Sequence, residues 1–207
     1  MSQDCCGPAC LPGQVGPRFR KALWIALVVN GIMFAVEVIG GLASGSVALW
    51  ADALDFAGDA ANYGISLAVL SLGLTWSSRA ALAKGLTMIG FGAFVVVRTA
   101  LAVVRGLPPE PLTMGAIALI ALAANGGVAL LLYAFRDGDA NMRSVWLCSR
   151  NDAIGNLAVM LAAAGVLGTG SGLPDILVAA VMATLALSSG VAVMRHARSE
   201  LAANRST

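Results

Sequence analysis

Long runs of apolar residues, separated by short polar or glycine- and proline-rich stretches, dominate the pattern of this chain. Each run is long enough to cross about 30 Å of hydrocarbon as a helix. Because backbone groups in lipid must hydrogen-bond within their own segment, we expect the runs to be helical. The pattern therefore predicts an all-α membrane protein, a bundle of six transmembrane helices. The spans are placed at residues 22–43, 46–74, 80–104, 112–135, 145–167 and 173–194.

The composition supports the same class. Of the 207 residues 58% are hydrophobic and 12% are charged, and the mean hydropathy is +0.84. These values are typical of membrane proteins. We expect three parts along the chain: a mobile, cysteine-containing cytoplasmic tail at 1–19, a six-helix transmembrane domain at 20–195, and a short cytoplasmic tail at 196–207. Little sequence is left for a separate soluble domain.

Basic residues cluster on alternate sides of the predicted spans. Cytoplasmic segments of membrane proteins carry an excess of Lys and Arg. One side holds Arg18, Arg20, Lys21, Arg79, Lys84, Arg136, Arg143, Arg195, Arg198 and Arg205. The other side holds only Arg105. Both termini are thus predicted to be cytoplasmic. We expect the protein in a prokaryotic plasma (inner) membrane. The net charge of +2 gives no reason to expect nucleic-acid binding.

Acidic residues interrupt two of the apolar runs. Asp52, Asp55 and Asp59 lie in the second run, and Asp152 lies in the fifth. Each carboxylate at membrane depth costs roughly 2.5–3.5 kcal/mol on insertion scales. Residues three, four and seven apart share a helix face, so the three aspartates form one stripe, which Asn62 extends. The stripe predicts a site facing the bundle interior, with a cation as the missing partner.

The fifth run repeats this arrangement, because Cys148, Asp152 and Asn156 follow at four-residue spacing. Two pairs on facing helices can enclose one divalent ion in four-coordinate geometry. The predicted ligands are Asp55, Asp59, Cys148 and Asp152, and the residues predicted to support them are Asp52, Asn62, Asn151 and Asn156. The alternative is structural: the acids pair helices or cap them, and Cys148 is a small apolar residue that buries readily.

At these residues the chain resembles the cation diffusion facilitator family of divalent-metal exporters. The first hairpin carries the resemblance with Asn30, Glu37, Gly40-Gly41, Ser44, Ser46-Val47-Ala48-Leu49, Ala51-Asp52-Ala53, Asp55 and Asp59. The fifth span carries it with Asn141-x-Arg143, Leu147-Cys148-x-x-x-Asp152 and Gly155. Zinc-transporting members usually have His-x-x-x-Asp in both spans, so Asp55 and Cys148 replace the histidines. Spans three, four and six resemble the family only weakly.

Two departures from the family pattern limit which properties of the family we expect in this chain. Family members usually continue into a cytoplasmic ferredoxin-like domain that binds metal and dimerises, whereas this chain stops soon after the sixth span. We therefore expect a short form that lacks this domain, and a homodimer formed through the spans. The only histidine is His196, in a basic segment, so none is left for the transport site.

The predicted ligands leave the identity of the ion open. A thiolate favours softer ions such as Zn²⁺ and Cd²⁺, whereas three carboxylates favour Mn²⁺, Fe²⁺ or Co²⁺. Zinc-class ions, with cadmium and cobalt next, are the expected substrates. The resemblance implies metal/proton antiport, with protons as the counter-ion, because ligands must lose protons to bind metal.

Two further groups of residues could take part. Cys5, Cys6 and Cys10 lie within six residues and could capture a soft ion, or they could be incidental or lipid-modified thiols. Glu37 and Arg98 are charges at membrane depth, and we expect them to form an ion pair or to belong to a proton path.

Other functions remain open at this stage. The chain could import a soft metal, or it could be a membrane metal sensor or interaction module that binds without transport. No nucleophile–base pair supports an intramembrane enzyme. Metal/proton efflux is the function that the sequence predicts first.

Overall fold

The computed structural model describes residues 17–72, 74–135 and 140–203, except the side chains at 68–72, 74–81, 84, 140–145, 148, 196 and 200–203. These ranges form six helices: α1 (Pro17–Ser44), α2 (Val47–Leu72), α3 (Leu74–Arg105), α4 (Pro111–Tyr133), α5 (Ala140–Thr169) and α6 (Leu173–Ala203). The predicted tail at 1–19, with Cys5, Cys6 and Cys10, lies outside the described residues except for 17–19, which begin α1.

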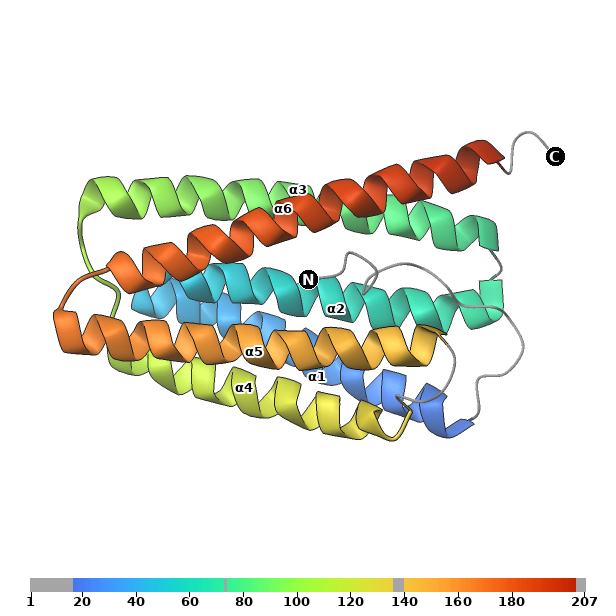
Figure 1. Ribbon diagram of the computed structural model, residues 1–207, viewed down its shortest axis with the longest axis horizontal. Coiled ribbons are helices and arrows are strands. Elements are labelled where there is room, and N and C mark those ends of the chain that lie inside the picture. The colour runs from blue at the N-terminus through green and yellow to red at the C-terminus, as the bar shows by residue number, and fades with distance from the viewer. Residues whose placement is uncertain (1–16, 73, 136–139, 204–207) are drawn as a thin grey trace.

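The helices run antiparallel and form one elongated bundle (Figure 1). Helices α1, α2, α5 and α4 contact one another in that order around a four-helix group, and α3 packs mainly against α6 along one side of it. Helix α1 begins at the same end of the bundle at which α6 ends, as six antiparallel helices require. We refer to this end as the cytoplasmic or inner end, following the orientation predicted from the basic residues.

Five of the six helices contain segments long and apolar enough to cross a membrane, counted over the described residues. These segments are Pro17–Ser44, Gly85–Arg105, Pro111–Tyr133, Ser149–Thr169 and Leu173–Ser199. Helix α2 is 26 residues long but carries three aspartates among its first thirteen residues. The membrane helical bundle predicted from the sequence is confirmed, and α2 is the helix whose polarity demands an explanation.

Several helices extend beyond the apolar runs that predicted them. Helix α5 begins at Ala140 rather than at residue 145, and α6 continues to Ala203. A helix satisfies its own backbone hydrogen bonds, so it does not need to end where lipid ends.

At the outer end of the bundle the turns between helices are tight. Gly45, Gly106 and Gly170 follow α1, α3 and α5 with positive φ, a conformation that glycine adopts without steric cost.

Glu110 precedes α4 and caps it. Its carboxylate accepts hydrogen bonds from the backbone N–H groups of Leu112 (3.0 Å) and Thr113 (2.6 Å). A hydrogen bond with the Thr113 side chain, followed by these two backbone contacts, lowers the pKa of Glu110 below its ordinary value. The side chain is exposed at the outer end of the bundle, where a negative charge also suits the helix N-terminus.

Glycines allow α3 and α6 to pack closely. A Cβ atom added at Gly85 would lie 2.6 Å from Cγ of Met194 and 3.1 Å from the carbonyl oxygen of Gly190. One added at Gly92 would lie 2.9 Å from the side chain of Leu187. Without a hydrophobic driving force in lipid, helix pairs rely on such close van der Waals packing. Helix α3 is therefore held close to α6 over the stretch from Gly85 to Gly92.

Three groups of buried apolar residues divide the interior along the bundle axis. The outer cluster contains residues of five helices, α2, α3, α4, α5 and α6. They are Val47–Ala51, Val95, Met114, Ala118, Val159, Ala162, Ala163, Ala179, Met182 and Ala183. The inner cluster joins α1, α2 and α4 through Phe19, Ala22, Leu23, Ala26, Tyr63, Leu67, Val128 and Leu132. Between them lies a thin middle layer of Met33, Phe56 and Ala121. Polar residues occupy the levels between these groups.

Asp175, near the start of α6, caps the start of α2. Its carboxylate accepts hydrogen bonds from Ser46 Oγ (2.6 Å) and from the backbone N–H groups of Val47 (2.9 Å) and Ala48 (3.0 Å). The side chain is only 2% exposed. The free N–H groups of a helix N-terminus and its positive dipole end stabilise a carboxylate placed there. Asp175 therefore fixes the outer ends of α2 and α6 to each other.

We expect Asp175→Ala to destabilise the protein by about 2–4 kcal/mol, because it leaves three buried donors without an acceptor. The measurement is the thermal unfolding midpoint of the purified chain in detergent. Asp175→Asn keeps one acceptor oxygen and should cost less. Ser171→Ala, which removes the exposed cap of α6, is the matched control and should cost only about 1 kcal/mol. Equal midpoints for Asp175→Ala and Ser171→Ala would contradict this account of the cap.

Candidate cation site

The predicted ligands lie on α2 and α5, half-way along the bundle. Asp59 is 8% exposed, whereas Asp55 and Asp152 are half-buried. Each of the three takes part in a further polar or electrostatic contact with its surroundings. Cys148 belongs to α5, but its side chain is not among the described ones. The i, i+4 spacing on α2 turns both carboxylates to nearly the same side of the helix.

A chain of hydrogen bonds connects α2 to α5 beside Asp59. The Tyr63 hydroxyl donates to Oδ2 of Asp59 over 3.1 Å and lies 2.8 Å from Oγ of Ser149. Since Tyr63 uses its single proton on Asp59, Ser149 is the donor in the second bond. Tyr63 and Ser149 are both completely buried. The carboxylate of Asp59 is therefore oriented by a tyrosine that α5 itself holds in place.

This contact also fixes the register of the two helices. Asp59 lies one turn outward from Tyr63 on α2, and Asp152 lies one turn outward from Ser149 on α5. Because α2 and α5 run in opposite directions and meet at Tyr63 and Ser149, Asp59 and Asp152 come to the same depth. The arrangement places carboxylates of two helices at one level of the interior.

The complete set of four ligands is not assembled by the side chains that the structure describes. Among these side chains, which exclude Cys148, no three or more of His, Cys, Asp and Glu lie close enough together to hold a metal ion. The described residues thus supply two parts of the predicted ligand set at matching depth. One part is the aspartates of α2, and the other is Asp152 of α5. The set of Asp55, Asp59, Cys148 and Asp152 stays a prediction.

The residues predicted to support the ligands occupy different environments. Oδ1 of Asn151 accepts a hydrogen bond from Nη2 of Arg150 at 3.3 Å, and the Arg150 guanidinium lies over the Trp146 ring. Asn62 is half-buried. Asn156 is completely buried, and neither its amide oxygen nor its nitrogen has a hydrogen-bond partner among the described residues. Asn156 therefore faces the interior, whereas Asn151 is tied to exposed Arg150.

Glu37 and Arg98 have separate neighbours. The Arg98 guanidinium lies over the ring of Trp50, 5.7 Å from its centroid, which is the geometry of a cation–π contact. Glu37 is completely buried, and Asp52 of α2 is an electrostatic neighbour of its carboxyl group. Within the described residues, neither oxygen of Glu37 has a protein donor. The predicted ion pair of Glu37 and Arg98 is thus not among the described contacts.

Sequence reasoning did not identify Tyr63, Ser149 or Asn125, and it named Asn30 only for the family resemblance and not as a site residue. The spacing of Asp59 and Tyr63, i and i+4 on a helix, was a usable signal for Tyr63. Nothing local indicated Ser149, which is 86 residues away from Tyr63. Asn30 and Asn125 are buried at 0% and 2% exposure, and their Oδ1 atoms have no partner among the described residues. They add polar atoms to the level of Asp59, between the inner cluster and the middle layer.

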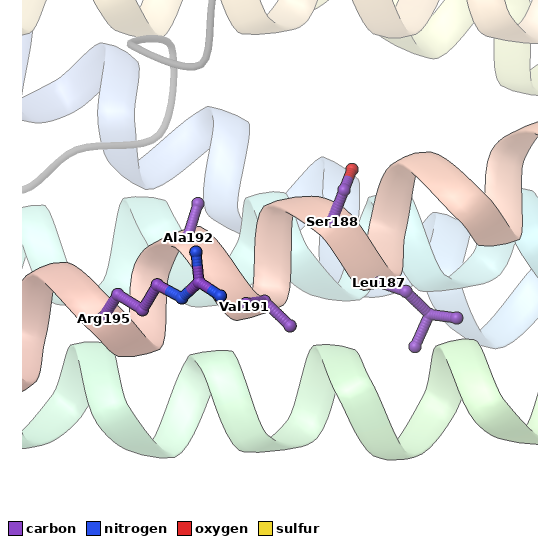
Figure 2. Close-up of a pocket in the computed structure, with 5 residues that line it drawn as sticks. All are labelled: Leu187, Ser188, Val191, Ala192 and Arg195. Carbon is purple, nitrogen blue, oxygen red and sulfur yellow. The ribbon is translucent and has the colours of Figure 1, made fainter.

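A cavity of about 530 Å³ lies against the inner half of α6 (Figure 2). Its described lining residues are Leu187, Ser188, Val191, Ala192 and Arg195. Ser188 and Ala192 point away from α3, whereas Leu187 points toward it. The lining contains a guanidinium and no described carboxylate, so it opposes rather than attracts a cation. This cavity does not compete with the α2–α5 aspartates as a cation site.

Comparison with known proteins places these features in a family. The family model of the cation efflux transmembrane domain matches residues 23–202. The chain is 28% identical over 197 residues to the zinc transporter ZitB of Pectobacterium atrosepticum, covering 87% of this chain and 61% of the relative. It is 26% identical over 197 residues to a "Cadmium, cobalt and zinc/H(+)-K(+) antiporter" of Bacillus velezensis, covering 87% and 62%. The chain thus spans about three fifths of the length of these relatives.

The matched region contains α2 to α5 completely, most of α1, nearly all of α6, and every described residue of the candidate site. Proteins of this family are transporters and not enzymes, which agrees with the absence of a nucleophile–base pair in the sequence. The apolar helices and the bacterial relatives agree with the predicted location in the plasma membrane. The chain is therefore an integral membrane protein that belongs to the cation efflux family.

Proposed function

We propose that this protein exports a divalent metal cation across the plasma membrane by metal/proton antiport. The observation that carries the proposal is the bond between Tyr63 and Ser149, which sets carboxylates of α2 and α5 at one depth. Carboxylates buried in a membrane bundle are costly unless they serve a cation or a proton path. The names of the two relatives, a zinc transporter and a cadmium, cobalt and zinc antiporter, support the same function.

The donor set supports zinc-class ions as the substrate. Asp55, Asp59 and Asp152 contribute oxygen, and Cys148 contributes sulfur if its side chain turns toward them. A mixed oxygen and sulfur set with four members suits Zn²⁺, Cd²⁺ and Co²⁺, whereas oxygen alone favours Mn²⁺ or Fe²⁺. The relatives' names mention zinc, cadmium and cobalt.

Proton exchange follows from the chemistry of the carboxylates. Several carboxylates at one level of a low-dielectric interior cannot all stay charged without a cation, so the empty site takes up protons. Metal binding displaces these protons, and protons arriving from the external side displace the metal there. Helices α2 and α5 are the elements that expose the site to each side in turn. A homodimer of this chain remains part of the proposal.

Replacing Asp59 with asparagine should abolish metal transport. The change keeps the volume of the side chain but removes the charge at the point where Tyr63 orients it. Uptake of Zn²⁺ into proteoliposomes under an imposed pH gradient is the measurement, and Asp59→Asn should match empty vesicles. Wild-type protein that binds Zn²⁺ without any flux would instead support a sensor, and flux toward the cytoplasmic side would support an importer.

Replacing Cys148 with serine should change the choice of ion rather than remove transport. A serine hydroxyl is a harder and weaker ligand than a thiolate, so Zn²⁺ and Cd²⁺ should lose affinity relative to Mn²⁺. Competition among these ions for uptake into the same proteoliposomes measures the change. An unaltered ion preference would show that Cys148 is not a ligand.

Tyr63→Phe should weaken metal affinity by about tenfold and lower the free energy of unfolding by about 1–3 kcal/mol, because the buried Ser149 and Asp59 each lose a hydrogen-bond partner. Phenylalanine fills the same space in the inner cluster but cannot donate to Asp59. Ser149→Ala should have a similar effect, because Ser149 holds the Tyr63 hydroxyl. Tyr133→Phe, at the exposed end of α4, is the matched control and should bind like wild type. Equal affinities for the two Tyr variants would remove Tyr63 from the account.

A further inference from the structure

Asn30 of α1 faces the bundle interior at a defined depth. It lies one turn from Ala26, which belongs to the inner cluster, and one turn from Met33, which belongs to the middle layer. Residues three or four apart share a helix face, so Asn30 faces the same interior as these two neighbours. Its side chain is 0% exposed. We call this depth, between the inner cluster and the middle layer, the polar level.

Asn125 of α4 occupies the equivalent position on its own helix. It lies one turn from Val128 of the inner cluster and one turn from Ala121 of the middle layer. Its side chain is 2% exposed. Helices α1 and α4 thus each place one buried amide at the polar level.

The other two helices of the four-helix group place carboxylates at this level. On α2, Asp59 lies one turn from Phe56 of the middle layer and one turn from Tyr63 of the inner cluster. On α5, Asp152 reaches the same depth because Ser149, one turn inward, bonds to Tyr63. The four helices contact one another in the order α1, α2, α5 and α4 (Figure 1). Each of them therefore contributes one polar residue to the polar level.

The two amides hold their oxygens apart from protein donors. Nδ2 of Asn30 donates to the Ala26 carbonyl at 2.8 Å, and because a carbonyl only accepts, this contact fixes which end of the amide is the oxygen. Oδ1 of Asn30 and Oδ1 of Asn125 are buried without a donor in the part of the chain that the structure describes. An asparagine that joins two helices bonds across to its neighbour, whereas the amide nitrogen of Asn30 bonds within α1.

The unpaired atoms and the charge of the polar level point to the same kind of ligand. Buried polar atoms in native proteins are almost always satisfied, so two buried amide oxygens without donors indicate a bound group. Asp59 and Asp152 make the level negative. The guanidinium groups of Arg98 and Arg150 lie over tryptophan rings instead. A metal cation satisfies carboxylates and amide oxygens together.

We propose that Asn30 and Asn125 are oxygen ligands of the transported ion, which extend its site to α1 and α4 and let it accept ions that take six ligands. The inference deepens the proposed function and rests on its cation site. The four predicted ligands of α2 and α5 match the number that Zn²⁺ takes in tetrahedral sites. Two amide oxygens bring the donors to six, the number that Mn²⁺ takes in octahedral sites.

The visible spectrum of bound Co²⁺ tests the number of ligands without any transport, because six-coordinate Co²⁺ absorbs far more weakly than four-coordinate Co²⁺. The full chain in lipid nanodiscs is compared as wild type, Asn30→Val, Asn125→Val and Thr99→Val. Valine removes the oxygen and leaves little room for a water molecule. Thr99 is a buried residue of α3 whose hydroxyl bonds within its own helix, so it is the matched control. We expect weak bands for wild type and Thr99→Val, and stronger bands for both asparagine variants.

The affinities of two ions provide a second measurement on the same samples. In Asn30→Val and Asn125→Val the Mn²⁺ affinity should fall by about tenfold, whereas the Zn²⁺ affinity should stay near that of wild type. Competition with a chromogenic chelator measures both. Asn30→Asp and Asn125→Asp keep an oxygen and add a charge, so they should bind Mn²⁺ more tightly than wild type. A purely structural role would lower both affinities together, along with the unfolding midpoint.

Several results would overturn the proposal. They are a four-coordinate spectrum for wild type, the wild-type spectrum in both valine variants, or equal losses of Mn²⁺ and Zn²⁺ affinity. If the valine variants do not fold, the aspartate variants decide, and an unchanged Mn²⁺ affinity in both contradicts ligation. Wild type that gives the expected spectra but moves no metal would remove the proposed transport and leave the two ligands in place. Metal flux with unaltered spectra would do the reverse.

Discussion

The cost of carboxylates at membrane depth governs the design of this bundle. Each one is expensive in hydrocarbon, by roughly 2.5–3.5 kcal/mol on insertion scales, and the described helices bury or half-bury six acidic residues. The structure meets part of this cost in two ways. The carboxylate of Asp175 accepts hydrogen bonds from the free N–H groups of α2, and the carboxylate of Asp59 accepts one from Tyr63.

Helix α2 is central because it carries most of these groups. It contacts α1, α3, α5 and α6, so its aspartates face protein rather than lipid. That position explains how a 26-residue helix with three aspartates can lie among five strongly apolar ones. It also explains why Asp175 of α6 caps α2. The first N–H groups of a helix have no partner within the helix, and in a helix surrounded by protein another residue of the protein must accept their hydrogen bonds.

The sequence predicted the helices well and the contacts between them poorly. Apolar runs place every helix end within six residues except the C-terminal end of α6, which lies nine residues further along the chain. The i, i+4 spacing of Asp55 and Asp59 places both on nearly one face. Asp175 and Ser46 are 129 residues apart, and no local pattern relates them. Glu37 and Arg98 were paired because opposite charges in lipid attract, but packing of α3 gives Arg98 the ring of Trp50 instead. Such neighbours depend on which helices lie side by side, which periodicity does not reveal.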